Sequence, residues 1–242
     1  MSSSQRNRVE ILGVQVDNLS MTDTLNILEE FVTEGKPRLI VTADAAGIVA
    51  AQTDAEWRKI MNDADLVTPD SVGVLWASKR AGNAISDRVS GVDLVEKLVS
   101  KGYRCFFLGA APGIAEKAKE VLTTKLPNAQ IVGVRDGFFN ESQEADLVAE
   151  IKRADPQVLF VAMGIPKQEK FIARHMHAIG AAINMGVGGS FDVLSGTVKR
   201  APLALQKMRL EWLWRLMQNP KKWKKVAALP KFWLMVLTSR RG

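Results

Sequence analysis

Carboxylates, amides and glycines recur in this sequence directly after short apolar runs that have the length of buried β-strands. Such residues suit a polar ligand, because carboxylates can accept protons and glycines let a ligand approach the backbone closely. Residues that follow different parallel strands meet at one edge of the sheet. The residues in these positions are Thr42, Asp44, Asp70, Asp136, Gly137, Phe138, Gly164, Gln168, Gly188, Gly189 and Asp192.

Asp70 follows Pro69 at the end of one predicted strand. A carboxylate fixed there could act as a general base that deprotonates an acceptor hydroxyl, a role typically worth about 10²–10⁴ in rate. It could equally cap a helix predicted over 71–79. Asp44 has the same two interpretations before its own predicted helix, and spacing alone leaves both choices open.

Two glycine-rich turns could approach a ligand. Gly186-Val-Gly-Gly189 places three glycines in four residues after a strand, an arrangement that could let a nucleotide lie against the backbone. The turn Gly109–Gly113 matches neither the dinucleotide-binding fingerprint nor the P-loop, and it is equally consistent with a simple strand-to-helix turn.

The sequence favours neither a metal nor another cofactor. Asp63-Ala64-Asp65 has the D-x-D pattern of metal-dependent sugar-nucleotide transferases, but it precedes a predicted strand and so belongs to the opposite edge of the sheet. His175 and His177 are two residues apart on a predicted helix and therefore face different directions. No arrangement of nucleophile, histidine and acid is legible.

Strand-like runs alternate with helical patterns through residues 1–198, which predicts an α/β fold with a Rossmann-like parallel sheet flanked by helices. The single cysteine, Cys105, lies in an apolar run and is expected in the core, as suits a reducing cytoplasm. Strands are predicted over 38–42, 65–68, 103–108, 130–134, 157–163 and 181–187, after one extended segment over 9–16. Helices are predicted over 22–33, 45–62, 71–79, 113–125, 143–154 and 167–177.

Residues 199–242 differ in composition and are predicted to form a basic helical appendage. They contain twelve of the 33 Lys and Arg residues, one of the 26 acidic residues and four of the six tryptophans. Pro220 and Pro230 are expected to break the helical pattern. The apolar run 232–237 is far shorter than the roughly 20 residues that span a bilayer.

Three interpretations of this appendage remain: an anionic membrane surface, nucleic acid, or a solvated helix face without a partner. Basic residues and tryptophan favour a membrane interface, where each Lys or Arg contributes about 1 kcal/mol. An exposed apolar run is seldom needed by a nucleic-acid binder. We therefore expect a membrane surface and no nucleic acid.

An ordered set of motifs resembles the WecG/TagA/CpsF glycosyltransferases, glycosyltransferase family 26, over about residues 9–230. Each motif is modest alone, but the ordered set is specific. The motifs are Ile11–Ser20, Val41-Thr42, Leu66-Val-Thr-Pro-Asp70, Arg88-Val-Ser-Gly91, Met163-Gly-Ile-Pro-Lys-Gln-Glu169, Gly188-Gly-Ser-Phe-Asp192, Lys199-Arg-Ala-Pro202 and Leu210-Glu-Trp-Leu-Trp-Arg215.

The resemblance implies an inverting, metal-independent enzyme on the cytoplasmic face of the cell membrane, bound peripherally. It would transfer N-acetylmannosamine or a related sugar from UDP to a polyprenyl-diphosphate-linked N-acetylglucosamine in surface-polysaccharide synthesis, including that of teichoic acid. Its oligomeric state stays open, a homo-oligomer included. The resemblance assigns the base to Asp70, the donor pocket to Thr42, Arg88 and Gln168, the nucleotide side to Phe138, Gly188, Gly189 and Asp192, and cations of the appendage to Arg215, Lys222 and Lys225.

The sequence departs from the family pattern at several positions. Asp44 stands where many members have Asn, and a charge there could alter the choice of donor sugar. Ser71 replaces a glycine after the base, Phe138 replaces a tyrosine that stacks on the pyrimidine, and lysines replace some arginines of the appendage. The alternative is a non-catalytic nucleotide-sugar-binding Rossmann protein that its basic tail tethers to the membrane.

Overall fold

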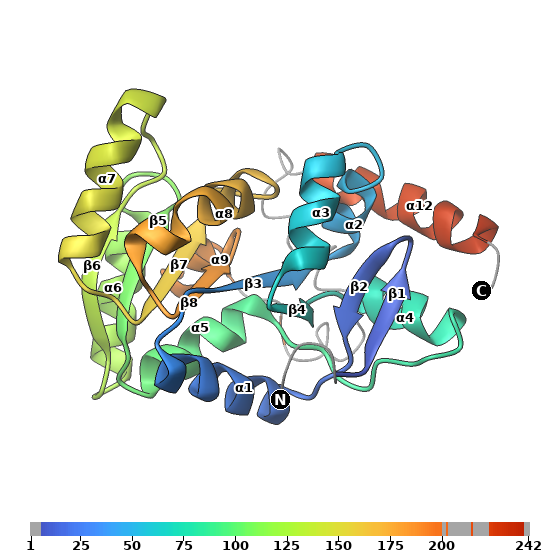
Figure 1. The fold of residues 1–242 in the computed structure, drawn as a ribbon, viewed down its shortest axis with the longest axis horizontal. Coiled ribbons are helices and arrows are strands. Elements are labelled where there is room, and N and C mark those ends of the chain that lie inside the picture. Colours follow the sequence, from blue (N-terminus) through green and yellow to red (C-terminus); the bar gives the residue numbers. More distant parts are fainter. Residues whose placement is uncertain (1–5, 200–201, 203–213, 215–222, 240–242) are drawn as a thin grey trace.

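A six-stranded parallel sheet forms the centre of the molecule (Figure 1). The computed structural model describes residues 6–199, 202, 214 and 223–239, and only the backbone of 223–227. All five pairings in the sheet are parallel, which confirms the predicted Rossmann-like α/β class. The strand order is β4 (Leu66–Pro69), β3 (Arg38–Ala43), β8 (Ile183–Gly186), β7 (Val158–Ala162), β5 (Arg104–Gly109) and β6 (Gln130–Arg135).

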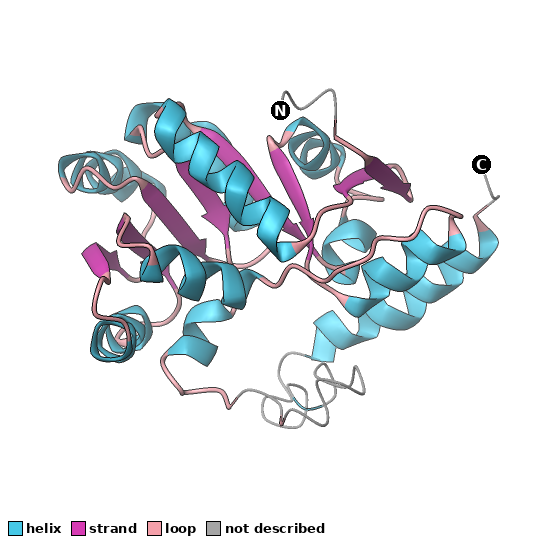
Figure 2. Cartoon of the chain, turned by 90° about the horizontal axis from the view of Figure 1, so that it is seen from below, coloured by secondary structure: helices cyan, strands magenta, loops and turns pink. Residues whose placement is uncertain are grey.

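Helices cover both faces of the sheet, as Figure 2 shows. Side chains of successive strand residues point to opposite faces. Cys105 and Phe107 of β5 accordingly belong to one apolar core, and Phe106 and Leu108 to the other. The first core is closed by α1 (Met21–Glu34), α5 (Gly91–Ser100), α6 (Ile114–Lys125) and α9 (Ser190–Leu194). The second is closed by α2 (Ala45–Ala50), α3 (Ala55–Asp63), α4 (Val72–Arg80), α7 (Glu141–Arg153) and α8 (Lys167–Ile179).

The predicted single extended segment over 9–16 is wrong. The chain there forms an antiparallel hairpin of β1 (Arg8–Ile11) and β2 (Val14–Asp17). Leu12 and Gly13 make its turn with φ of 52° and 77°. Positive φ at both central residues matches the twist of a two-residue hairpin, and glycine supplies one of the two positions without strain.

The predicted helix over 45–62 is divided into α2 and α3. Asp54 causes the restart, because its carboxylate accepts a hydrogen bond of 2.9 Å from the Trp57 N–H and so caps α3. Two helices, α5 and α9, were not predicted at all. Both begin at the carboxyl edge of the sheet, so the omission affects the site.

The C-terminal helix α12 (Trp223–Thr238) continues through Pro230, so the break predicted there is wrong, while the break predicted at Pro220 lies outside the described residues. A proline inside a helix costs about 3 kcal/mol or more, and packing offsets that cost here. Phe232 is fully buried and Val236 is 6% exposed, in contact with the core of the body. The helix lies against α2 and α4 at the β4 end of the sheet (Figure 1).

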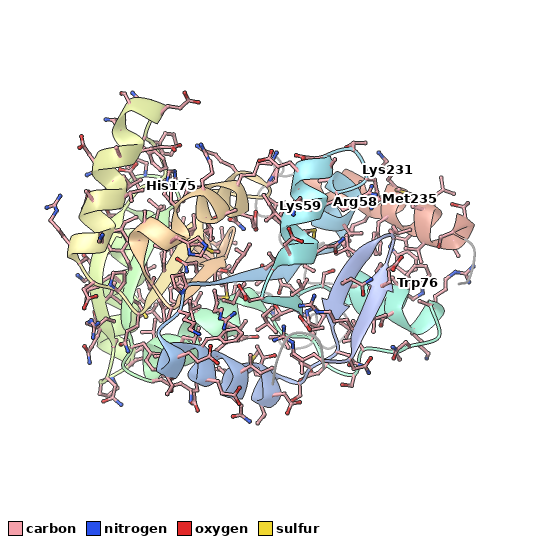
Figure 3. The ribbon with its side chains drawn as sticks, viewed as in Figure 1. Arg58, Lys59, Trp76, His175, Lys231 and Met235 are labelled. Carbon is pink, nitrogen blue, oxygen red and sulfur yellow. The ribbon has the colours of Figure 1, made fainter. Side chains whose placement is uncertain are left out.

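A tryptophan pair joins α12 to α4. The rings of Trp76 and Trp233 have centroids 3.9 Å apart, and Trp76 and Met235 are labelled at this end of the molecule in Figure 3. Trp233 is still 41% exposed beside this contact, and Leu234 and Leu237 are also exposed. Within the described ranges, no helix combines the length and apolar character needed to cross a bilayer. The predicted division of the chain at residues 198 and 199 stays a prediction.

Candidate functional site

Asp70 lies directly after β4, at the carboxyl edge of the sheet. Its backbone N–H donates to the carbonyl of Ala43 at 3.0 Å, and its half-buried carboxylate accepts a 3.2 Å hydrogen bond from the N–H of Gly91. Ser71, rather than Asp70, caps α4 through the Val74 N–H. The interpretation of Asp70 as the cap of that helix is therefore wrong.

The carboxylate of Asp70 instead faces the first turn of α5. Gly91 is the first residue of that helix, and its N-cap residue, Ser90, makes no side-chain capping bond. The amino end of a helix carries partial positive charge and free N–H groups, so a carboxylate is favourably placed there. Sequence reasoning missed this contact because it did not predict α5.

Thr42 lies next to the same turn. Its hydroxyl is buried and donates to the carbonyl of Gly186 at 3.1 Å. A Cβ at Gly91 would lie 3.4 Å from Cγ2 of Thr42 and 3.8 Å from Oγ of Ser190. The ends of β3, β4 and β8 thus meet around the start of α5, which brings Thr42 and Asp70 together as predicted from their positions after the strands.

Asp44 caps α2, as one of its two interpretations proposed. Its Oδ1 accepts a 2.6 Å hydrogen bond from the N–H of Gly47. The carboxylate is half-buried. An asparagine oxygen could accept the same bond, so the cap does not require the negative charge that distinguishes Asp44.

Gln168 joins two loops at the centre of the carboxyl edge. Its Oε1 accepts hydrogen bonds of 3.0 Å from the N–H groups of both Gly164 and Gly188, and its Nε2 donates to Oε1 of Glu169 at 2.7 Å. The side chain is only 1% exposed. Gln168 therefore fixes the loops that follow β7 and β8, while direct contact with a donor stays a prediction.

Gly186 makes room for this buried amide. A Cβ there would lie 2.5 Å from Oε1 of Glu169 and 2.6 Å from Nε2 of Gln168, closer than side-chain atoms pack. Gly188, in contrast, has a positive φ of 52° and open space where a Cβ would be. Gly186 is thus required by packing, whereas Gly188 leaves open space beside the edge of the sheet.

Gly189 is the N-cap residue of the short helix α9. Asp192 lies in the first turn of that helix and is half-buried. They share the β8 end of the site with Gly188. Arg88 precedes α5 and is half-buried. Its neighbour Val89 donates a backbone hydrogen bond of 2.9 Å to Pro69, which places the Arg88 backbone beside the Pro69-Asp70 segment.

Phe138 lies at the other end of the edge, after β6, with 74% of its surface exposed. The strand order separates β6 from β4 by five strand spacings, about 24 Å at 4.8 Å each. The next residue, Phe139, packs against Phe171 of α8 with ring centroids 5.8 Å apart. This contact draws the loop that carries Phe138 toward the middle of the sheet.

The remaining candidate residues lie away from the carboxyl edge or outside the residues that the structure describes. Arg215 and Lys222 lie outside the described residues, and Lys225 lies in α12, where its side chain is not described. The Asp63-Ala64-Asp65 motif is at the amino edge, as predicted. Asp65 accepts hydrogen bonds from Arg38 and the Leu39 N–H, and Asp63 pairs with Lys59.

Comparisons with known proteins relate the whole chain to one family of enzymes. A sequence model described as the glycosyl transferase WecG/TagA/CpsF family matches residues 9–242. The chain is 34% identical to the N-acetylglucosaminyldiphosphoundecaprenol N-acetyl-beta-D-mannosaminyltransferase of Bacillus subtilis (strain 168), over 93% of this chain and 89% of that protein. It is 31% identical to the protein of the same name from Staphylococcus aureus (strain MW2), over 97% of this chain and 94% of that protein.

Proposed function

The chain belongs to the WecG/TagA/CpsF family of glycosyl transferases, and on that premise we propose that it transfers N-acetylmannosamine or a related sugar from UDP to a polyprenyl-diphosphate-linked N-acetylglucosamine. The names of its relatives support the acceptor and the sugar. The observation that carries the proposal is the Asp70 carboxylate, held by the first N–H of α5 at the carboxyl edge to which the open Gly188 loop also belongs.

In the proposed reaction, Asp70 takes the proton of the acceptor hydroxyl as the hydroxyl oxygen attacks the anomeric carbon. A single displacement inverts that carbon. The bond from the anomeric carbon to the diphosphate oxygen breaks, and its electron pair leaves with UDP. Fixed cations and N–H groups stabilise developing charge without reorganisation, so we assign this role to protein groups rather than to a metal, with Arg88 and Arg215 as the cations.

The donor sugar is the least constrained part of the proposal. Asp44 brings a carboxylate to the start of α2, two residues after Thr42 of β3. A sugar that carries a hydroxyl or amide donor could bond to it, whereas a sugar carboxylate would be repelled. A panel of UDP-sugars that includes N-acetylmannosamine and its uronic acid, assayed with a short-chain lipid-diphosphate N-acetylglucosamine, identifies the donor.

We place the enzyme peripherally on the cytoplasmic face of the cell membrane. The exposed side chains of Trp233, Leu234 and Leu237 support this location, because aromatic and aliphatic side chains on a basic helix favour the interface of an anionic bilayer. The acceptor's lipid is in the same bilayer. The membrane-bound position would thus bring the lipid-linked acceptor close to the edge of the sheet that carries Asp70.

The substitution Asp70→Asn tests the base. Asparagine keeps an oxygen that can accept the Gly91 N–H but cannot take a proton, so UDP binding should persist while turnover falls by about 10²–10⁴. Sugar transfer and UDP affinity would be measured on the same preparation. An Asp70→Asn enzyme with normal turnover would remove Asp70 from the mechanism. Absence of transfer from every donor by the unsubstituted chain, with UDP still bound, would favour a non-catalytic nucleotide-sugar-binding protein.

A further inference from the structure

Lys167 is the first residue of α8 and follows the loop after β7. Its side chain is exposed, and its Nζ lies 5.5 Å from the centroid of the Phe139 ring. It forms no hydrogen bond or ion pair with any residue in the described part of the chain. A cation is therefore available at the carboxyl edge of the sheet, next to the loop that carries the exposed Phe138.

The strand order places Lys167 between the two ends of the proposed donor site. β7 lies three strand spacings from β4, which precedes Asp70, and two from β6, which precedes Phe138. At about 4.8 Å per spacing these are about 14 Å and 10 Å. A nucleotide sugar with its base at Phe138 and its sugar near Asp70 must carry its diphosphate over the β7–β8 region, where the Gly188 loop leaves open space.

We propose that the Lys167 ammonium binds the diphosphate of the nucleotide donor and of the nucleoside diphosphate product. This inference rests on the proposed function. When the bond from the anomeric carbon to the diphosphate oxygen breaks, the electron pair stays on that oxygen and the diphosphate gains negative charge. The acceptor proton goes to Asp70, and Lys167 stabilises the leaving group. The amino end of α8, whose N-cap residue Pro166 provides no side-chain cap, adds a favourable dipole.

The contact with Phe139 suits this role. An ammonium over a ring face is attracted by about 0.5–1 kcal/mol at exposed sites, which is weak enough for the side chain to turn to a phosphate. Phe139 itself packs on Phe171 and is therefore fixed. The ring thus limits the directions in which the flexible lysine can point before a ligand arrives.

Titration of the full chain with uridine, UMP and UDP tests the inference by calorimetry. We expect Lys167→Met to bind UDP about tenfold more weakly, a loss of about 1.4 kcal/mol, with uridine affinity unchanged. Lys167→Arg should retain most of the UDP affinity. The control is Lys152→Met, which removes the same charge from an exposed position in the last turn of α7, at the amino edge of the sheet. It should bind all three ligands like the unsubstituted chain.

Two results would overturn the inference. UDP affinity that does not change in Lys167→Met would show that the ammonium does not contact the diphosphate. An equal loss of uridine and UDP affinity would show that Lys167 only supports the aromatic loop. Transfer assays keep the two proposals separate: a chain that binds UDP but transfers no sugar contradicts the proposed function, while the ligand series still decides the role of Lys167.

Discussion

At the scale of single residues, the site depends on backbone N–H groups as much as on side chains. The Gly91 N–H donates to Asp70, and those of Gly164 and Gly188 donate to Gln168. Backbone groups are fixed by the elements that carry them, so they cost little to organise before a substrate binds. Substitutions that change only a backbone donor are consequently the most informative probes of the base.

Gly91→Pro removes the N–H that Asp70 accepts and puts the proline Cδ in place of the hydrogen, so the carboxylate must also move away from the start of α5. Proline is favoured at the first position of a helix, and Ser90, with φ −80° and ψ 135°, already has the conformation that a following proline requires. A hydrogen bond to a charged group contributes about 1.5–3 kcal/mol. We expect the kcat for sugar transfer to fall about tenfold or more, with little change in KM for the donor.

Gly91→Ala is the matched control for that substitution. It keeps the N–H, and its Cβ would make an ordinary 3.4 Å contact with Thr42. Its kcat should stay within about twofold of the unsubstituted enzyme. Equal losses in both variants would mean that crowding at Thr42, rather than the hydrogen bond, limits activity.

The sequence predicted which residue types gather at the site but not how they bond. Asp70 and Thr42 could be placed because each directly follows a recognisable strand. The partner of Asp70 could not, since it is a backbone group on a helix that was not predicted. The spacing of Ser90 and Asp93 matches a capping box, S-x-x-D, and was the available signal for that helix. Glu169, which orients Gln168, was likewise missed because a buried carboxylate has no distinctive spacing.

At the scale of elements, α12 has one buried side and other side chains that are exposed. Phe232 and Val236 are buried against the body, whereas Trp233, Leu234 and Leu237 are exposed. Sequence reasoning did not separate these residues, since they form one apolar run after a proline. Packing against α2 and α4, which sequence periodicity does not reveal, allows the helix to continue through Pro230.

Two substitutions in α12 should therefore affect different properties of the protein, one its stability and the other its binding to membranes. Phe232→Ala empties a fully buried site and should lower the free energy of unfolding by about 3–5 kcal/mol. Leu234→Ala changes an exposed side chain and should alter it by no more than about 0.5 kcal/mol, while weakening binding to anionic vesicles. Urea denaturation and vesicle sedimentation measure the two effects. Normal vesicle binding by Leu234→Ala and by the double variant with Trp233→Ala would argue against this side as the membrane contact.

At the scale of the whole molecule, the α/β class followed from the alternation of apolar runs with helical patterns, whereas the strand order did not. Chain order alone does not indicate that β8 lies between β3 and β7, or that β6 forms an edge. That order decides that Asp70 and Phe138 lie at opposite ends of the site and that Lys167 lies between them. The candidate residues could therefore be predicted from the sequence, but their positions relative to one another could not.

The core that contains Phe107 also shields the single cysteine, Cys105, from solvent. Burial raises the pKa of the Cys105 thiol to about 12. Because this value is above the usual range, the folded protein keeps the thiol protonated, and therefore unreactive, up to strongly alkaline pH. We expect no alkylation by iodoacetamide at pH 8 in the native protein and stoichiometric alkylation in urea. Mass spectrometry measures both, and rapid labelling of the native protein would indicate local opening around β5.

The burial of Phe232 has a consequence for how shortened versions of this protein behave. A Cβ at Gly73 would lie 3.3 Å from that of Ala45 and 3.5 Å from the Phe232 ring. Ala45 and Gly73 belong to the first turns of α2 and α4, next to Asp44 and close to Asp70. Helix α12 thus packs against the helices whose first turns lie next to Asp44 and close to Asp70, the proposed base. We expect a protein shortened before Phe232 to lose sugar transfer even in an assay without a bilayer, because these first turns lose part of their packing.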